Sequence, residues 1–281
     1  DRARAAEAGR DPATLGDEHP RTLSIRSGLA VAIEQRGDPA ASAEMLRELV
    51  PIATRVWGPD HRDTNILKTN LAFALDQIGS IDESLVLTRE ILESTERTLG
   101  ADHADTINAR NGLAGALYRH ADFEGAAELL AVSRDIALER FGRLHVRSLD
   151  SGANLAQVLR RTGDTTRASS VAEEVLIDAQ AYFGAENPEL AWYAKVAGDI
   201  RLELGDAPGA VERLELAREL VARQHDYPLH RSTLKSLASA LHAAGRRDEA
   251  LRVIEACATL MRSEGESEEA IEALQQLAPA P

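Results

Sequence analysis

The chain has 281 residues, of which 44% are hydrophobic and only 4% are aromatic, and its formal net charge is −14. This acidity argues against nucleic-acid binding, because a polyanion would be repelled and the basic footprint of such proteins is missing. The single cysteine, Cys257, excludes an internal disulfide and a cysteine-based metal site. No apolar run approaches the roughly 18 residues that a membrane-spanning helix needs, and no secretory leader is visible. The sequence therefore predicts a cytoplasmic protein that does not bind membranes.

The first residues already have a helical pattern. The chain begins with Asp1, and residues 2–10 are rich in alanine and charged side chains. We interpret residues 1–15 as the end of a preceding helix, and the chain as a fragment of a longer polypeptide.

From residue 16 onward the pattern Gly-x-x-His recurs every 42 residues. It occurs at Gly16/His19, Gly58/His61, Gly100/His103 and Gly142/His145, and at Gly184/Asn187 with asparagine instead of histidine. A repeat without insertions indicates one supersecondary unit whose apolar face is buried against the next copy. We expect repeats to start near residues 16, 58, 100, 142, 184 and 224, the last interval being shorter around residues 223–227.

The second copy shows what each unit contains. Apolar residues between Thr64 and Ile78 recur at steps of three and four, which predicts a helix with a buried stripe. Thr64 is its expected N-cap and Gly79 its stop. A second helix is predicted over residues 81–99, ended by Gly100, where a left-handed backbone costs glycine least. Because no segment alternates in hydrophobicity, we predict no strands, and each copy is interpreted as a helical hairpin.

The repeated histidines do not indicate a metal site. Successive hairpins in a helical stack lie about 10 Å apart, whereas a bound metal needs its ligand nitrogens within about 2 Å. We therefore expect the histidines to be loop residues, and we predict neither a metal nor a cofactor. Cys257 lies in an alanine-rich helical pattern and is expected to be a small packed residue.

The end of the chain predicts a cap. Residues 267–277, with the sequence Ser-Glu-Glu-Ala-Ile-Glu-Ala-Leu-Gln-Gln-Leu, have an acidic helical pattern. We expect a capping helix that shields the apolar end of the stack, so that the repeats occupy residues 16–263 and residues 264–281 form the capping helix and a tail.

The motifs of the third copy resemble the tetratricopeptide repeat, in the 42-residue form of kinesin light chain and many bacterial proteins. They are Leu-Gly-Ala-Asp-His at 99–103 with Thr106, Asn-Gly-Leu-Ala at 111–114, and Phe-Glu-Gly-Ala at 123–126. The resemblance extends over nearly the whole chain. It implies an all-α fold, a right-handed α-solenoid of about six helix-turn-helix hairpins with a C-terminal capping helix. The first helix of each hairpin (the A helix) would line a concave groove, and the second (the B helix) would form the outer face.

The resemblance also implies which side chains face the groove. Position by position, the expected partner-binding residues are Asn70, Phe73, Asn108, Asn111, Tyr118, Arg119, Asn154, Gln157, Arg161, Trp192 and Lys195. Asn70 and Asn154 stand where the family often keeps an asparagine that hydrogen-bonds a bound peptide backbone, since an amide both donates and accepts. The alternative interpretation is that these two asparagines are solvated or cap neighbouring turns. The asparagine ladder is incomplete, because Gly28, Gly112 and Val196 occupy the matching positions.

Two groups of residues have two interpretations each. Arg119, Arg160 and Arg161 form either a site for an acidic partner segment or a solvated helix end. Trp192 and Tyr193 are either binding anchors or fill the space left where Leu-Ala becomes Ala-Gly at 197–198.

No pattern predicts catalysis. A nucleophile with its base, a carboxylate pair in one pocket and a phosphate-binding loop are all missing, and the carboxylates lie on polar helix faces. The leading hypothesis is therefore a scaffold or sensor module that binds a protein or peptide. The resemblance implies that such arrays often form the C-terminal sensor of bacterial signalling ATPases of the nucleotide-switch class, including actinobacterial regulators, with the ATPase domain N-terminal in the same polypeptide. The alternatives are a self-contained receptor for a small signalling peptide and a structural spacer.

Overall fold

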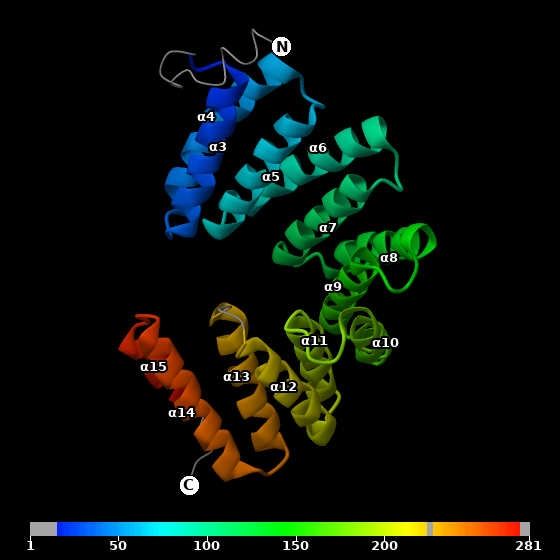
Figure 1. Cartoon of the computed structure of the whole chain (residues 1–281), viewed down its shortest axis with the longest axis vertical. Coiled ribbons are helices and arrows are strands. Elements are labelled where there is room, and N and C mark those ends of the chain that lie inside the picture. The colour runs from blue at the N-terminus through cyan, green and yellow to red at the C-terminus, as the bar shows by residue number, and fades with distance from the viewer. Residues whose placement is uncertain (1–15, 224–226, 276–281) are drawn as a thin grey trace. The chain divides into compact units, whose positions relative to one another are not determined.

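The computed structural model describes residues 16–223 and 227–275, and every regular element in this part of the chain is an α-helix (Figure 1). The hairpins are α3 (Pro20–Gln35) with α4 (Pro39–Trp57), α5 (Arg62–Gln77) with α6 (Ile81–Leu99), α7 (Ala104–Arg119) with α8 (Phe123–Phe141), α9 (Val146–Thr162) with α10 (Thr165–Phe183), α11 (Leu190–Glu203) with α12 (Ala207–Val221), and α13 (Tyr227–Ala243) with α14 (Arg247–Ser263), followed by α15 (Glu268–Gln275). The predicted preceding helix in residues 1–15, the repeat start near residue 224 and residues 276–281 lie outside the described residues.

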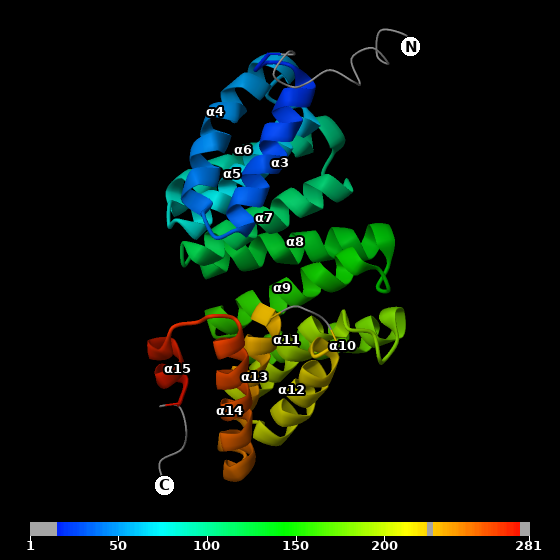
Figure 2. The same cartoon turned by 60° about the vertical axis from the view of Figure 1, so that its left-hand side comes forward.

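Successive helices pack against one another. The chain divides into two compact units, residues 1–129 and 130–281, with the boundary inside α8. In the first unit each helix from α3 to α7 contacts the next, and in the second the same holds from α9 to α15 (Figure 2). Such nearest-neighbour packing defines a solenoid, so the prediction of an all-α solenoid is confirmed. None of the described helices is both long and apolar enough to cross a bilayer.

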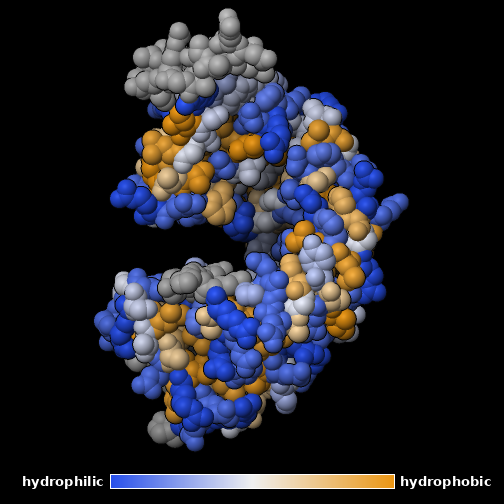
Figure 3. Space-filling view, in the orientation of Figure 1, coloured by the Kyte–Doolittle hydropathy of each residue, from blue (hydrophilic) through white to orange (hydrophobic). Residues whose placement is uncertain are grey.

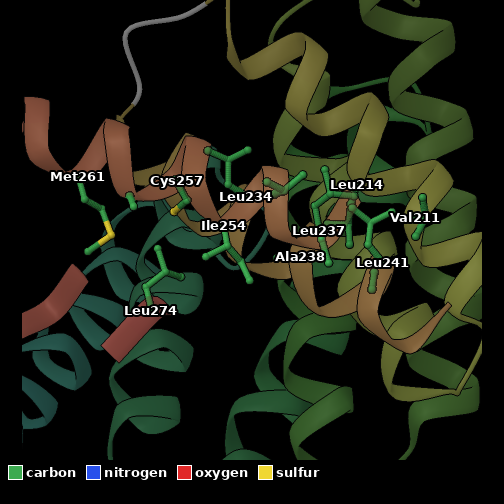
Figure 4. Packing of buried hydrophobic residues seen from close by; sticks show 14 of the residues in the cluster. Val211, Leu214, Leu234, Leu237, Ala238, Leu241, Ile254, Cys257, Met261 and Leu274 are labelled. Atoms are coloured by element: carbon green, nitrogen blue, oxygen red, sulfur yellow. The ribbon is translucent and has the colours of Figure 1, made fainter. Parts of the chain in front are cut away.

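Small and aliphatic side chains form the cores, as the low aromatic content predicts. In the second unit, one cluster joins α12, α13, α14 and α15 and includes Leu214, Leu237, Ile254, Cys257 and Leu274 (Figure 4). Cys257 is fully buried in this cluster, and burial raises the pKa of its thiol. The prediction that this cysteine is a packed residue is confirmed.

The recurrent loop joins the end of a B helix to the start of the next A helix. In the second copy His61 is the N-cap of α5, and its Nδ1 accepts a hydrogen bond from the backbone N–H of Asp63 at 3.2 Å. Thr64 lies inside the helix, and its Oγ1 donates to the carbonyl oxygen of Gly58 at 2.8 Å. The expectation that Thr64 is the N-cap is therefore wrong, because the imidazole takes that role and the threonine ties the helix back to the glycine. The next two copies make both bonds as well. The imidazoles of His103 and His145 each accept a backbone N–H, and the hydroxyls of Thr106 and Ser148 each donate to the carbonyl oxygen of the loop glycine.

The glycine of this loop has a backbone that other residues avoid. Gly58, Gly100 and Gly184 have φ of 101°, 91° and 87° with ψ of 158°, 162° and 150°. This lies beyond the left-handed helical region that the sequence predicts, in a region open essentially to glycine alone. The predicted helix over residues 81–99 and the stop at Gly79, whose φ is 78°, are confirmed.

The histidine cap gives a first testable prediction. His103→Ala is expected to lower the free energy of unfolding by about 1 kcal/mol, because the N–H of Asp105 loses its acceptor. His103→Asn should cost much less, since Asn187 already accepts the equivalent N–H, that of Glu189, at 2.9 Å in the fifth copy. Urea denaturation of the three proteins measures both values. Equal losses for the two variants would show that the cap hydrogen bond contributes nothing.

A second prediction concerns the turn between α7 and α8. Among the described non-glycine residues only Ala121 has a positive φ, 62°, at the position that Gly79 occupies in the second copy. A left-handed backbone costs an L-residue about 1–2 kcal/mol, which a glycine would not pay. Glycine, however, has more conformational entropy in the unfolded state, and this offsets roughly 0.4–1 kcal/mol of the gain. Ala121→Gly should therefore raise the free energy of unfolding by about 0.5–1 kcal/mol. Gly79→Ala is the matched reverse change, because no atom lies within 4 Å of the added Cβ, and it should lower stability in the same denaturation assay.

Candidate functional site

One face of α5 in the first unit is turned to solvent. Ile66, Asn70, Phe73 and Gln77 follow one another at steps of four, three and four, which places them on one side of the helix. Ile66 is 41% exposed and Phe73 is 57% exposed, whereas Leu75 on the opposite side is fully buried. We call these four residues the α5 stripe.

Hydrogen bonds link the α5 stripe to the preceding A helix, α3. Nδ2 of Asn70 donates to Oγ of Ser27 at 3.5 Å, and Nε2 of Gln77 donates to Oε1 of Glu34 at 2.6 Å. In both pairs the partners are 43 residues apart, one more than the repeat length. The amide of Asn70 is thus partly engaged within the array through its nitrogen.

The next A helix, α7, continues this pattern with a charge pair. The guanidinium of Arg119 is hydrogen-bonded to the carboxylate of Asp76, whose side chain is only 8% exposed. Because Asp76 neutralises Arg119, this residue is neither a free basic site nor a merely solvated helix end. Of the other α7 candidates, Asn108 is exposed and Asn111 is half-buried. The Tyr118 ring packs edge-on against Phe123, with the ring centroids 5.2 Å apart.

A cavity of about 590 Å³ lies between α5, α6 and α7. Its lining comprises Asp60, His61, Arg62, Asn65, Thr69, Ile91, Thr95, Thr98, Leu99, His103, Asp105, Asn108 and Ala109. Asn65 was not among the predicted site residues. Its Nδ2 donates to Oγ of Ser94 at 2.9 Å, and its buried Oδ1 accepts no hydrogen bond from any described residue. A polar side chain within the buried stripe of α5 was the only sequence signal for this cavity.

Hydrophobic side chains also reach the surface on α3 (Figure 3). Ile25 and Leu29 are 46% and 50% exposed, whereas Leu67 and Leu71, their counterparts one repeat later, are 2% and 3% exposed. Within the described residues nothing covers this face of α3. It belongs to the end of the described array and is separate from the α5 stripe.

In the second unit the predicted residues on α9 differ in exposure. Asn154 and Gln157 are half-buried, and Arg161 is exposed. Neither amide makes a side-chain hydrogen bond to another residue in the described part of the chain. The donors and acceptors of both amides are therefore not used by other described side chains.

A mixed-charge cluster joins α9 to α11. Nζ of Lys195 lies 2.7 Å from Oδ2 of Asp199, and the Arg160 guanidinium lies 3.9 Å from the same oxygen and 3.4 Å from Oε1 of Glu203. Lys195 is only 13% exposed. Each cation has a carboxylate partner, so Arg160 and Lys195 do not form an uncompensated positive patch.

Trp192 and Tyr193 have different surroundings. Tyr193 is 4% exposed, its hydroxyl donates to Oδ1 of Asp150 at 2.6 Å, and burial together with this carboxylate raises its pKa. It is a buried residue that links two A helices and not an exposed binding anchor, whereas the position beside Gly198 is occupied by Leu214. Trp192 is half-buried and keeps part of its ring at the surface.

A second network ties α10, α11 and α12 together. Glu173 accepts hydrogen bonds from Nε of Arg201 at 2.6 Å and from Nη2 of Arg213 at 3.2 Å. Burial alone would raise the pKa of Glu173, but the two guanidinium groups outweigh it and the pKa is lowered. The network links three consecutive helices of the second unit through one carboxylate. Among the described residues, no three histidine, cysteine or acidic side chains come together as a metal site.

Comparison with known families decides what this array is. Models of the tetratricopeptide repeat match residues 63–139 and 147–223, residues 233–268, and residues 22–63. The chain belongs to the tetratricopeptide-repeat family. This family consists of protein-interaction modules that are typically non-catalytic. Among curated proteins, no sequence matches the chain.

Solved structures share the tetratricopeptide-repeat fold at low sequence identity. BtubC (BKLC) from P. vanneervenii has a TM-score of 0.64 at 18% identity, covering 87% of this chain and 93% of that one. Nearly identical TPR-like repeats of a kinesin light chain from Podosopora anserina give 0.61 at 22% identity, covering 74% and 98%. NprR in complex with its cognate peptide NprX gives 0.62 at 15% identity, covering 91% and 72%. At these identities the likeness establishes the fold alone.

Proposed function

We propose that this chain is the partner-binding part of a larger bacterial signalling protein, a cytoplasmic scaffold or sensor with a nucleotide-switch ATPase domain N-terminal in the same polypeptide. The partner is a protein or peptide segment held along the A helices. Support comes from membership in a family of interaction modules and from the surface chemistry of those helices.

The exposure of Phe73 is the observation that carries the proposal. In a chain with 4% aromatic residues, an aromatic side chain that is 57% exposed in the middle of a helix loses hydrophobic free energy unless something covers it. Ile66, two turns earlier on the same stripe, provides further apolar area, and Asn70 between them provides an amide that can bind a peptide backbone. Aromatic anchors flanked by polar groups are typical of binding hot spots.

In the second unit the proposed contacts come from residues with unused capacity. Asn154 and Gln157 offer amides, and Trp192 offers part of its ring. Arg119 and Lys195 would contribute through their side-chain stems more than through charge, because Asp76 and Asp199 neutralise them.

Affinity capture from lysate of the source organism tests the proposal. Phe73→Ala should reduce the affinity for the captured partner by about 30-fold, the effect of losing a hot-spot residue worth about 2 kcal/mol. Val86→Ala on α6 is the matched control, because Val86 has the same 57% exposure but lies on a B helix. Partners bound equally by both variants would contradict binding at the α5 stripe.

A self-contained receptor for a small signalling peptide is the second candidate. It is favoured by the fold shared with NprR, a protein solved with its cognate peptide, and by the cavity in the first unit. A receptor should become more compact when a peptide binds, because the ligand favours the conformation it contacts best. Small-angle X-ray scattering separates the two functions: a decrease in the radius of gyration with a short peptide supports the receptor, and an unchanged radius with a captured protein supports the scaffold.

A further inference from the structure

Three positions of the α5 stripe, those of Ile66, Asn70 and Phe73, recur without charge on the neighbouring A helices. Their counterparts one repeat away are Ser24, Gly28 and Val31 on α3 and Asn108, Gly112 and Gly115 on α7. We call these nine residues the neutral band, and all of them are exposed or half-buried. The band is free of charge although 28% of the chain is charged.

The repeat itself does not exclude charge from these positions. In the second unit the fourth copy has Asp150 at the position of Ile66, and the fifth copy has Asp199 at the position of Phe73. The neutral surface is therefore a property of the A helices of the first unit and not a requirement of the fold.

The cations of these three helices are held on the side of the B helices. Arg26, Lys68 and Arg110 occupy the same repeat position, and they are the only charged residues between the first and last band positions of their helices. Each is paired with a glutamate of a B helix. The pairs are Arg26–Glu48, Lys68–Glu90 and Arg110–Glu96, with N–O distances of 3.1, 2.7 and 2.7 Å. Because the side chains of Lys68 and Arg110 are only 10% and 4% exposed, their charges are not offered to a ligand on the band.

We propose that the neutral band binds an uncharged segment of the partner polypeptide, a proposal that rests on the function proposed above. Apolar side chains of the segment pack on Phe73 and Ile66, and its backbone amide groups meet the side-chain amides of Asn70 and Asn108, which both donate and accept. A charged side chain held against the band would lose its hydration without gaining an opposite charge. The band thus selects its partner by rejecting charge of either sign.

Selection from a displayed library of random peptides tests the proposal on the full chain. Peptides that the parent retains and Phe73→Ala loses should contain about half as many charged residues as the unselected library, or fewer, because the band rejects charge. The Phe73→Ala chain should fold normally, since the ring is exposed. Val86→Ala on the B helix α6 is the matched control and should retain the same peptides as the parent.

Substitutions at Gly112 isolate the effect of charge within the band. A Cβ added there meets no atom within 4 Å, so a longer side chain fits without disturbing α7. Gly112→Gln adds a neutral side chain, and Gly112→Glu and Gly112→Lys add side chains of similar length with charge of either sign. The most enriched Phe73-dependent peptide, once synthesised, should bind both charged variants about tenfold more weakly than Gly112→Gln, because binding would desolvate the added charge.

An excess of acidic or basic residues in the Phe73-dependent peptides would overturn the preference for an uncharged segment. A charged Gly112 variant that binds the peptide as tightly as Gly112→Gln would overturn it too. In both cases binding at the α5 stripe would stand, and with it the proposed function. If no retained peptide depends on Phe73, the band does not bind a polypeptide segment, and the proposed function then rests on partner capture alone.

Discussion

Truncation of the chain after Gly265, which removes α15, is expected to lower the free energy of unfolding of the second unit by about 3–5 kcal/mol. Ile271 and Leu274 of α15 are fully buried and 3% exposed, and both belong to the cluster that contains Met261 (Figure 4). Each buried aliphatic side chain of this size contributes about 1.5–3 kcal/mol. The truncated chain should also self-associate, because the last hairpin of a repeat array exposes apolar surface when its cap is missing.

Urea denaturation and size-exclusion chromatography with light scattering measure these two effects. Truncation after Gln275 retains α15 and should behave like the parent. Leu274→Ser should reproduce part of the loss, whereas Glu272→Ser, at an exposed position of the same helix, should not. A truncated chain that stays monomeric with an unchanged melting temperature would show that α15 does not cap the array.

Gly198→Leu is expected to lower the free energy of unfolding by about 3 kcal/mol, the upper end of the usual cost of overpacking a core. Gly198 lies in α11 against α12, and a Cβ added there would be 2.6 Å from Cγ of Leu214 and 3.3 Å from the carbonyl oxygen of Ala210. Leu214 is itself fully buried, so it has no free space to move into. The two helices must therefore move apart, and the buried contacts between them are lost.

Glycines of other A helices provide the control for Gly198. A Cβ added at Gly112 in α7 or at Gly28 in α3 meets no atom within 4 Å. Gly112→Ala should raise stability by about 1 kcal/mol, because alanine is the better helix former, whereas Gly198→Ala should lower it despite the same propensity gain. The sign difference, measured by urea denaturation, distinguishes a packing glycine from a tolerated one, and a gain at both positions would contradict close approach of α11 and α12.

The helices themselves could be predicted from the sequence because local chemistry specifies them. The span of α6 follows from an apolar stripe that begins after Gly79 and ends at Gly100, and it matches the prediction residue for residue. The start of α5 was displaced, because threonine is a common N-cap and histidine is not, so the imidazole of His61 was overlooked. Whether the histidine or the threonine caps the helix depends on the turn made by the preceding glycine. The periodicity of apolar residues carries no information about that turn.

The candidate surface was less predictable, because it depends on how one hairpin is rotated on the next. The pairs Ser27 with Asn70 and Asp76 with Arg119 are offset from the repeat by one residue, which reflects a small stagger between neighbouring A helices. A single sequence reports the period and not the stagger. For the same reason Tyr193, a candidate anchor in the sequence, is an internal link to Asp150 in the structure.

The residues that define the repeat in the loop are tied together by hydrogen bonds. The threonine hydroxyl donates to the glycine carbonyl at the end of the preceding hairpin, and the imidazole Nδ1 accepts an N–H at the start of its own helix. The features that copies share are thus the ones that any array of this length needs, whatever it binds. The choice of partner must therefore depend on positions at which the copies carry different residues. One such position is occupied in turn by Gly28, Asn70, Gly112, Asn154 and Val196. A chain of this kind can acquire a new partner when those side chains change, while the loops between its hairpins stay the same.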